Sequence, residues 1–374
     1  MRLMIGDSVM ADDSVLVAGG GIAGLALARA LRRNGVRAIV SERTATASRT
    51  GGLAINLPGN AITAFAGLGL RDELERLGRP THRREYRSAK GRLLFAVDED
   101  DFWGPDARPR CVRRADLLAL LDEPHHDNRR PASVTGVRLE DGGARVTFED
   151  GHEEQHGFVA GADGVRSAVR ASVFPGDSVR TSLLSTASWR FMAPNPGVDC
   201  WTVWSGAAGA FLLIPVDGDE VYGYASATGG GPVEADPAWL ARSFHDYPGP
   251  VRAVLDTVSE QALYHSPVEE VRIDRWAHGR VALIGDAAHA TAPVWAQGGA
   301  LAVEDALVLA RLLAGGDWDT AGERYQQQRR ERVRHVQAAT DRFSKAASLP
   351  TWLRDLILPV VGPKSYREAY GPLR

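Results

Sequence analysis

Near both ends of the chain, short apolar stretches alternate with segments in which apolar residues recur with the period of a helix. Apolar runs at 15–18, 36–40 and 281–284 are typical of parallel strands that are buried on both faces. Residues 298–316 are apolar on nearly every side, which predicts a buried helix, whereas 320–347 is a polar, arginine-rich helical stretch. Strands followed by helices predict an α/β fold.

In the middle of the chain, hydrophobic residues recur with the two-residue period of β-strands. Residues 86–97 predict strands of a second sheet, 134–148 predicts a hairpin, and aromatic and β-branched residues cluster in short strands over 182–271. Residues 51–70 read as a strand that turns into a helix after Pro58. Leucines on one face of 110–122 predict a helix there.

Composition adds few constraints. The chain has 374 residues, 44% of them hydrophobic, and a net charge of −3, which argues against a nucleic-acid surface. No apolar run reaches the ~20 residues of a membrane span, and residues 1–14 lack the apolar core of a signal peptide. Two cysteines, Cys111 and Cys200, form neither a metal-ligand pattern nor a disulfide framework. We expect a soluble cytoplasmic protein with no metal, no nucleic-acid partner and no membrane span.

The first apolar run ends in a glycine motif of the G-x-G-x-x-G type. Gly19 permits a tight turn, Gly21 leaves room for a pyrophosphate, and Gly24 lets the following helix pack closely on the strand. The helix N-terminus favours the phosphate charge. Glu42 ends the next strand, where a carboxylate accepts hydrogen bonds from an adenosine ribose and repels a 2′-phosphate. This βαβ unit predicts a site for FAD or NAD rather than NADP.

Three further motifs follow the glycine motif along the chain. They are R-x-x-L-x-x-x-L from Arg114, G-A-D-G-x-x-S-x-V-R from Gly161, and G-D-A-A-H with Pro293 from Gly285. Together with the glycine motif and Glu42-Arg43, the chain resembles the single-component FAD-dependent aromatic hydroxylases of the p-hydroxybenzoate hydroxylase fold. The stretch 292–306 is most similar to salicylate-hydroxylase-like members, and tetracycline-inactivating monooxygenases share the same frame.

The resemblance implies non-covalent FAD and a set of residues that hold it. Asp286 is expected at the ribityl hydroxyls, and the helix N-terminus after Ala296 at the pyrimidine edge of the flavin. The implied cofactor-binding residues are Gly19, Gly21, Ala23, Gly24, Glu42, Arg43, Arg114, Asp163, Asp286, Ala296, Gly298 and Gly299.

The resemblance also implies an architecture. We expect a Rossmann-like FAD-binding domain with an inserted antiparallel β-sheet domain for substrate and a C-terminal helix. The FAD-binding domain is expected to be discontinuous, over 1–76, 106–176 and 272–345. The substrate domain would comprise 77–105 and 177–271, with a helical tail over 346–374.

The implied activity is monooxygenation of an aromatic or polycyclic, polyketide-like small molecule. NAD(P)H would visit as a transient cosubstrate, O₂ would supply the oxygen, and a C4a-hydroperoxyflavin would transfer it. Alternatives on the same fold are an epoxidase, a Baeyer–Villiger oxygenase or a dehydrogenase. An alternative of another class is a non-catalytic flavin-binding accessory protein. A monomer and a homodimer are equally compatible with the sequence.

No side chain is predicted to be an indispensable acid or base. His289 and Pro293 are expected near the flavin, with His289 either donating a proton or holding its loop, and buried Asp305 is expected to close hydrogen bonds. Because alternate strand residues face opposite ways, about half of the aromatic residues of the inserted sheet should be packing. The expected substrate-pocket residues are Trp189, Arg190, Phe211, Leu213, Tyr222, Pro293 and Trp295.

Overall fold

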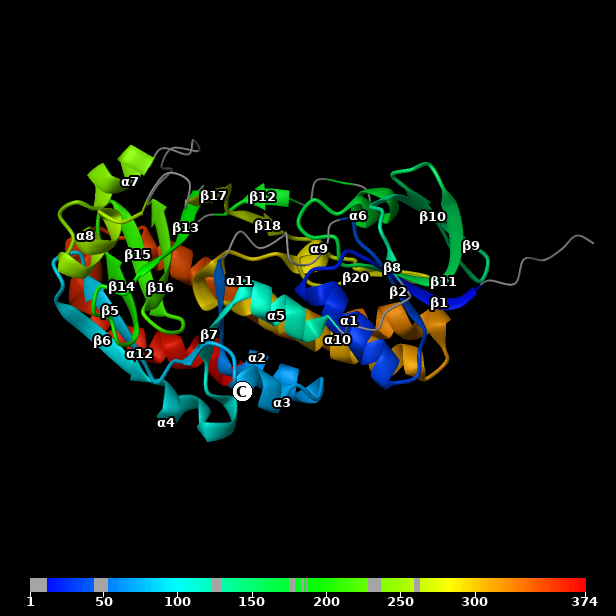
Figure 1. Cartoon of the computed structure of the whole chain (residues 1–374), viewed down its shortest axis with the longest axis horizontal. Helices are drawn as coiled ribbons and strands as arrows, with labels where there is room; N and C mark the ends of the chain where they lie inside the picture. The colour runs from blue at the N-terminus through cyan, green and yellow to red at the C-terminus, as the bar shows by residue number, and fades with distance from the viewer. Residues whose placement is uncertain are drawn as a thin grey trace, which may run out of the picture.

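The computed structural model describes residues 12–43, 53–122, 129–174, 176, 179–182, 185, 187–227, 237–258 and 263–374. The expectation about residues 1–11 therefore lies outside the described part of the chain. Two sheets stand at opposite ends of an elongated molecule, with the long helices α10 (Gln297–Ala314) and α11 (Trp318–Ala347) between them (Figure 1).

The first sheet confirms the predicted dinucleotide fold. Strand β1 lies at its centre and pairs in parallel with β11 and β2, and β11 pairs in parallel with β20. Helix α1 (Ile22–Arg33) connects β1 to β2 and packs on α10. The strands on the main path of the sheet are β19 (Ala277–His278), β20 (Val281–Leu283), β11 (Glu153–Gly161), β1 (Asp12–Ala18), β2 (Ala38–Ser41) and β8 (Arg129–Arg130), and the predicted hairpin is β9 (Val134–Glu140) with β10 (Gly143–Phe148).

The second sheet has seven strands, and two helices cover one of its faces. Its neighbours run antiparallel as predicted, except β5 (Arg83–Ser88) and β14 (Trp201–Ser205), which run parallel. Helices α7 (Pro237–Phe244) and α8 (Gly249–Leu255) pack on the outer face. In order, the strands are β17 (Tyr264–Pro267), β13 (Ala187–Pro194), β16 (Glu220–Ala227), β15 (Gly209–Pro215), β14 (Trp201–Ser205), β5 (Arg83–Ser88) and β6 (Leu93–Asp98).

The helix predicted over 110–122 is wrong in its first turn. Residues Arg110–Arg113 form strand β7, which pairs with β3 (Ala54–Leu57) and β4 (Arg79–Pro80), and only Arg114–Leu121 is helical (α5). Pairing with distant strands outweighs the local helical pattern. The remaining short elements are α2 (Gly59–Gly67), α3 (Arg71–Glu75), α4 (Glu99–Trp103), α6 (Ala168–Val173), α9 (Asp286–His289) and the two-stranded sheet β12 (Val179–Thr181) with β18 (Glu269–Val271).

The C-terminal segment is part of the body of the protein rather than a free tail. Helix α12 (Thr351–Tyr370) packs on β6 and α11, and its last turn buries Tyr366 and Tyr370. None of the described helices is long and apolar enough to cross a membrane. The strands of the seven-stranded sheet fall within 77–105 and 177–271, but the domain boundaries themselves stay a prediction.

Candidate functional site

The three glycines of the first βα turn differ in what surrounds them. Gly19 has a φ of +107°, and a Cβ there would lie 2.5 Å from the carbonyl oxygen of Ala162. A Cβ on Gly24 would overlap the carbonyl oxygen of Gly19. Gly21 has a φ of −77°, which any residue adopts, and an added Cβ would meet nothing within 4 Å. Gly19 and Gly24 therefore serve the fold, whereas Gly21 leaves a space open beside the helix N-terminus.

Acidic residues stand on both sides of this turn. Glu42 accepts a hydrogen bond of 3.0 Å from the backbone N–H of Gly20, so its carboxylate is held at the turn. Asp163, at the end of β11, accepts from the N–H of Val169 at 3.1 Å, while its other oxygen finds no partner among the described residues. Burial raises the pKa of Asp163. The side chain of Arg43 is 69% exposed and lies 3.8 Å from Glu149, so its cofactor contact stays a prediction.

A single cavity of about 1250 Å³ runs from this turn to the inner face of the seven-stranded sheet. At the dinucleotide end the walls include Gly21, Ile22, Ala23, Arg114, Asp286, Ala296, Gly298 and Gly299. Most of the predicted cofactor residues therefore share one space.

Asp286 and Arg114 place opposite charges on this wall. Asp286 begins α9 and lines the cavity, and its side chain is exposed to that space. Burial raises the pKa of Asp286, and the positive charges of His289, Arg114 and Arg190 oppose this rise. Burial also lowers the pKa of Arg114, against the attraction of Asp286. A carboxylate that faces the cavity can accept hydrogen bonds from hydroxyls such as those of a sugar alcohol chain.

The N-terminus of α10 opens onto the same space. A short turn, η4 (Pro293–Trp295), leads into Ala296, whose φ of +53° is the only positive φ of a non-glycine residue in the described part of the chain. Gly298 and Gly299 line the cavity in the first helical turn. The first N–H groups of a helix have no partner within it and attract negative charge.

His289 holds the loop rather than facing the cavity. Its Nε2 lies 2.6 Å from Asp305, which also accepts from the N–H of Gly285 at 3.0 Å and from Arg329 at 2.7 Å. His289 is buried, and the cavity walls do not include it. The geometry supports the interpretation that His289 holds its loop. Asp305 lies at the centre of the buried hydrogen bonds expected for it.

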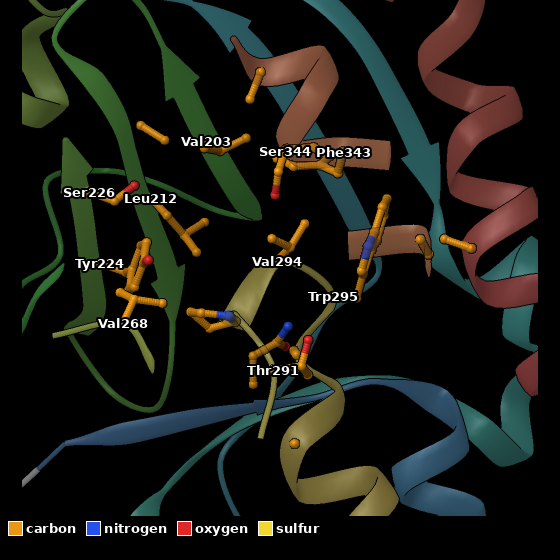
Figure 2. A pocket seen from close by; sticks show the side chains of 18 of the residues that line it. Val203, Leu212, Tyr224, Ser226, Val268, Thr291, Val294, Trp295, Phe343 and Ser344 are labelled. Carbon is orange, nitrogen blue, oxygen red and sulfur yellow. The ribbon is translucent and has the colours of Figure 1, made fainter. Parts of the chain in front are cut away.

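The sheet end of the cavity corrects part of the predicted pocket. Arg190, Tyr222, Pro293 and Trp295 line it as predicted. Trp189, Phe211 and Leu213 do not: they face α7 and α8 in a separate core, where Phe211 is 0% exposed. Their strand neighbours face the cavity instead, because successive strand residues point to opposite faces. Figure 2 shows Leu212 and Tyr224 on adjacent strands pointing toward Val294.

Sequence reasoning missed the contribution of the last two helices. The end of α11 supplies Phe343 and Ala347 to the cavity wall, and α12 supplies Ile357, Leu358 and Gly362. The segment is helical as predicted, but its apolar residues are spread around the helix and several are exposed, so its sequence gives no clear signal of the wall that it forms.

A buried polar network fixes α12 beside η4. Arg84, which also lines the cavity, forms an ion pair with Glu99 and donates to Tyr370 at 3.3 Å. Tyr366 donates to Glu99 at 2.7 Å, and Tyr370 donates to the carbonyl oxygen of Trp295 at 2.8 Å. The network connects the second sheet, the last helix and the turn at the dinucleotide end.

Comparison with known proteins agrees with this site. The FAD binding domain family matches residues 12–343. A 2-heptyl-3-hydroxy-4(1H)-quinolone synthase of Pseudomonas aeruginosa is 32% identical over 96% of this chain and 97% of its own. An aurachin C monooxygenase/isomerase of Stigmatella aurantiaca is 31% identical over 92% of this chain and 93% of its own.

Solved structures show the same fold over nearly the whole length. Klebsiella pneumoniae HpxO, crystallised with FAD and uric acid, has a TM-score of 0.79 at 26% identity and covers 98% of this chain and 94% of its own. The glycine turn with room for a pyrophosphate, the shared cavity and these similarities agree with one another. The chain belongs to the FAD binding domain family of single-component aromatic hydroxylases and is an FAD-dependent monooxygenase.

Proposed function

We propose that the protein hydroxylates an aromatic small molecule, with NAD(P)H as electron donor and O₂ as oxygen source. The observation that carries this proposal is the single cavity that joins the glycine turn to an apolar, aromatic sheet face. The names of the relatives, a hydroxyquinolone synthase and an aurachin monooxygenase, support an aromatic heterocycle as substrate. FAD, when bound, supplies the activation of O₂.

The residues at the dinucleotide end would bind and orient the cofactor. Gly21 would leave space for the pyrophosphate and Asp286 would accept from the ribityl hydroxyls, while Glu42, which accepts from the Gly20 N–H, would also accept from the adenosine ribose. Arg114 lies within electrostatic reach of Asp286 and would also help to balance the charge of the phosphates. The first turn of α10, at Gly298, would stabilise negative charge at the flavin edge.

The residues at the sheet end would position the substrate and exclude water. Arg190, Tyr222 and Tyr224 give this wall its polar groups among aliphatic side chains. Burial raises the pKa of both tyrosines, so they stay neutral and available as hydrogen-bond donors at physiological pH. Arg190 is suited to a carbonyl, phenolate or carboxylate oxygen of the substrate.

Isotope labelling tests the proposal. The FAD-loaded protein is mixed with NADH or NADPH under ¹⁸O₂, with catalase present, and with a panel of phenols, hydroxybenzoates and quinolones. We expect a substrate that accelerates NAD(P)H oxidation and a product that carries one ¹⁸O atom. A product oxidised without label would instead support the dehydrogenase alternative. Rapid NAD(P)H oxidation that yields only hydrogen peroxide with every compound would contradict the proposal.

A control variant separates substrate positioning from cofactor binding. Arg190→Met keeps the length of the side chain but removes its charge at the sheet end of the cavity. We expect unchanged FAD retention and a KM raised about tenfold or more for substrates with an anionic oxygen, the scale of one charged hydrogen bond. An unchanged KM for every such substrate would remove Arg190 from the substrate site.

A further inference from the structure

The cavity continues beyond the polar groups of the sheet into an arm with largely apolar walls. On one side, Val203 of β14 and Leu212 of β15 are register partners that both face inward. On the other side stand Phe343 and Ala347 of α11 with Ile357 and Leu358 of α12. Figure 2 shows Val203, Leu212 and Phe343 around the same space as Val294. We call the space between these two walls the tail arm.

Aliphatic side chains make up the two walls of the tail arm, and Arg354, one turn before Leu358 on α12, also lines the cavity. Ser344 lies at its wall, but its hydroxyl already donates to the carbonyl oxygen of Thr340 at 2.9 Å. Aliphatic walls on two sides favour an apolar occupant, because removing apolar surface from water is the main source of binding energy there. Leu212 is the register partner of Tyr224 on β16, and Tyr224 is the register partner of Arg190 on β13, so the polar groups that suit an aromatic head follow the tail arm along one row across the sheet.

We propose that the substrate is amphiphilic, with an aromatic head beside the dinucleotide end and a flexible apolar tail in the tail arm. This inference rests on the proposed function, because the head must lie where oxygen is transferred. The heptyl group in the name of one relative has the chemistry that such an arm would accept. A compact aromatic acid would leave the aliphatic walls of the tail arm in contact with water.

Binding to the FAD-loaded protein tests the tail without requiring turnover. The probes are 2-methyl- and 2-heptyl-4(1H)-quinolone, with 4-methylphenol and 4-heptylphenol as a second pair of heads, titrated against the flavin absorbance. A fully buried methylene increases affinity by about fourfold, so burial of between three and four of the six added methylenes would make the heptyl member of at least one pair bind about 100-fold more tightly. Dissociation constants within threefold of each other in both pairs would overturn the inference.

Two leucines of α12 provide a matched pair of variants. Leu358→Trp places bulk in the tail arm, whereas Leu356→Trp makes the same change on the outer face, where Leu356 is 68% exposed. We expect Leu358→Trp to weaken heptyl binding by about tenfold or more, the effect of excluding at least two methylenes, and to change methyl binding by less than threefold. Leu356→Trp should change neither. Equal weakening of both probes by Leu358→Trp would contradict the inference.

Two further measurements keep the outcomes distinct. If the Leu358→Trp protein loses FAD, the same titration is made with Val203→Phe, which fills the tail arm from the opposite wall. Tail-dependent binding without ¹⁸O incorporation would support the tail arm and contradict the proposed hydroxylation. If the protein hydroxylates its substrates with a kcat/KM that does not depend on the length of their alkyl chain, the proposed function is supported and the inference of an apolar tail is overturned.

Discussion

Ala296 adopts a backbone conformation that is less favourable for alanine than for glycine. Its φ of +53° and ψ of 32° are left-handed, at the residue that precedes α10. This conformation costs an alanine about 1 kcal/mol relative to glycine. We therefore expect Ala296→Gly to raise the free energy of unfolding by about 1 kcal/mol, as measured by urea denaturation of the FAD-free protein. Ala300→Gly, inside the same helix, should lower it by about 1 kcal/mol or more. Destabilisation by Ala296→Gly would show that the conformation is not strained.

Asp305 makes stability depend on pH in the acid range. Burial acts to raise its pKa, but His289 and Arg329 outweigh this and lower the pKa from 3.8 to about 2. A carboxyl with a lowered pKa stabilises the fold above about pH 4, and this contribution disappears as the pH falls toward 2. Asp305→Asn should therefore reduce the free energy of unfolding by about 2–3 kcal/mol at pH 7.

Comparing the two proteins across pH isolates this carboxyl. Denaturation of wild type and Asp305→Asn between pH 7 and pH 2 should show a difference that is constant down to about pH 4 and shrinks below it. Other acidic groups titrate equally in both and cancel. A difference that stays constant to pH 2 would mean that the pKa of Asp305 is not lowered.

At the scale of elements, we expect two glycines at the start of α1 to differ in their roles: one affects FAD binding and the other affects folding. A Cβ on Gly21 enters open space, whereas one on Gly24 overlaps the Gly19 carbonyl. We expect Gly21→Ala to leave the FAD-free protein as stable as wild type, within about 0.5 kcal/mol, but to weaken FAD binding by about tenfold or more. Gly24→Ala should destabilise the protein even without FAD. The checks are urea denaturation and flavin fluorescence titration; unchanged FAD affinity of Gly21→Ala would remove the pyrophosphate from this turn.

Two neighbouring residues of β15 also differ in their roles, because one packs in the core and the other faces the cavity. Phe211 is fully buried against α7 and α8, while Leu212 faces the cavity. Phe211→Ala should lower the free energy of unfolding by about 3–5 kcal/mol, the usual cost of truncating a core phenylalanine. Leu212→Ala should change stability much less and raise the KM of the true substrate. The sequence alone predicts Phe211 in the substrate pocket, and a KM effect confined to Phe211→Ala would restore that prediction.

At the scale of the whole molecule, the Arg84–Glu99 pair holds the sheet, α12 and η4 together. Both side chains are buried, and desolvation opposes the charge of Arg84 while Glu99 supports it. Glu99→Leu leaves a buried charge unpaired and should cost about 3–5 kcal/mol in urea denaturation. The double variant Arg84→Met/Glu99→Leu removes both charges and should recover most of that loss. A double variant that is no more stable than Glu99→Leu would show that the ion pair is not the cause.

Local pattern was sufficient for the parts of the protein whose signal lies within a few consecutive residues. The βαβ unit from β1 to β2, the hairpin of β9 and β10, and the buried helix α10 all follow from period and turn chemistry. The dinucleotide site followed as well, because a glycine turn and a helix N-terminus bind phosphate through their own backbone. Asp286 and Arg114 were found only through the order of motifs, since a single carboxylate or arginine carries no local signal.

Contacts between distant segments decided the rest. Period two shows that Phe211 and Leu212 face opposite ways, but only the position of α7 and α8 determines which of them meets the cavity. The strand at Arg110–Arg113 depends on pairing with β3, and α12 became a cavity wall because its tyrosines bond to Glu99 and to the turn at Trp295. Burial and pairing energies come from partners far away in the chain, so the substrate end of this protein is defined by its tertiary structure.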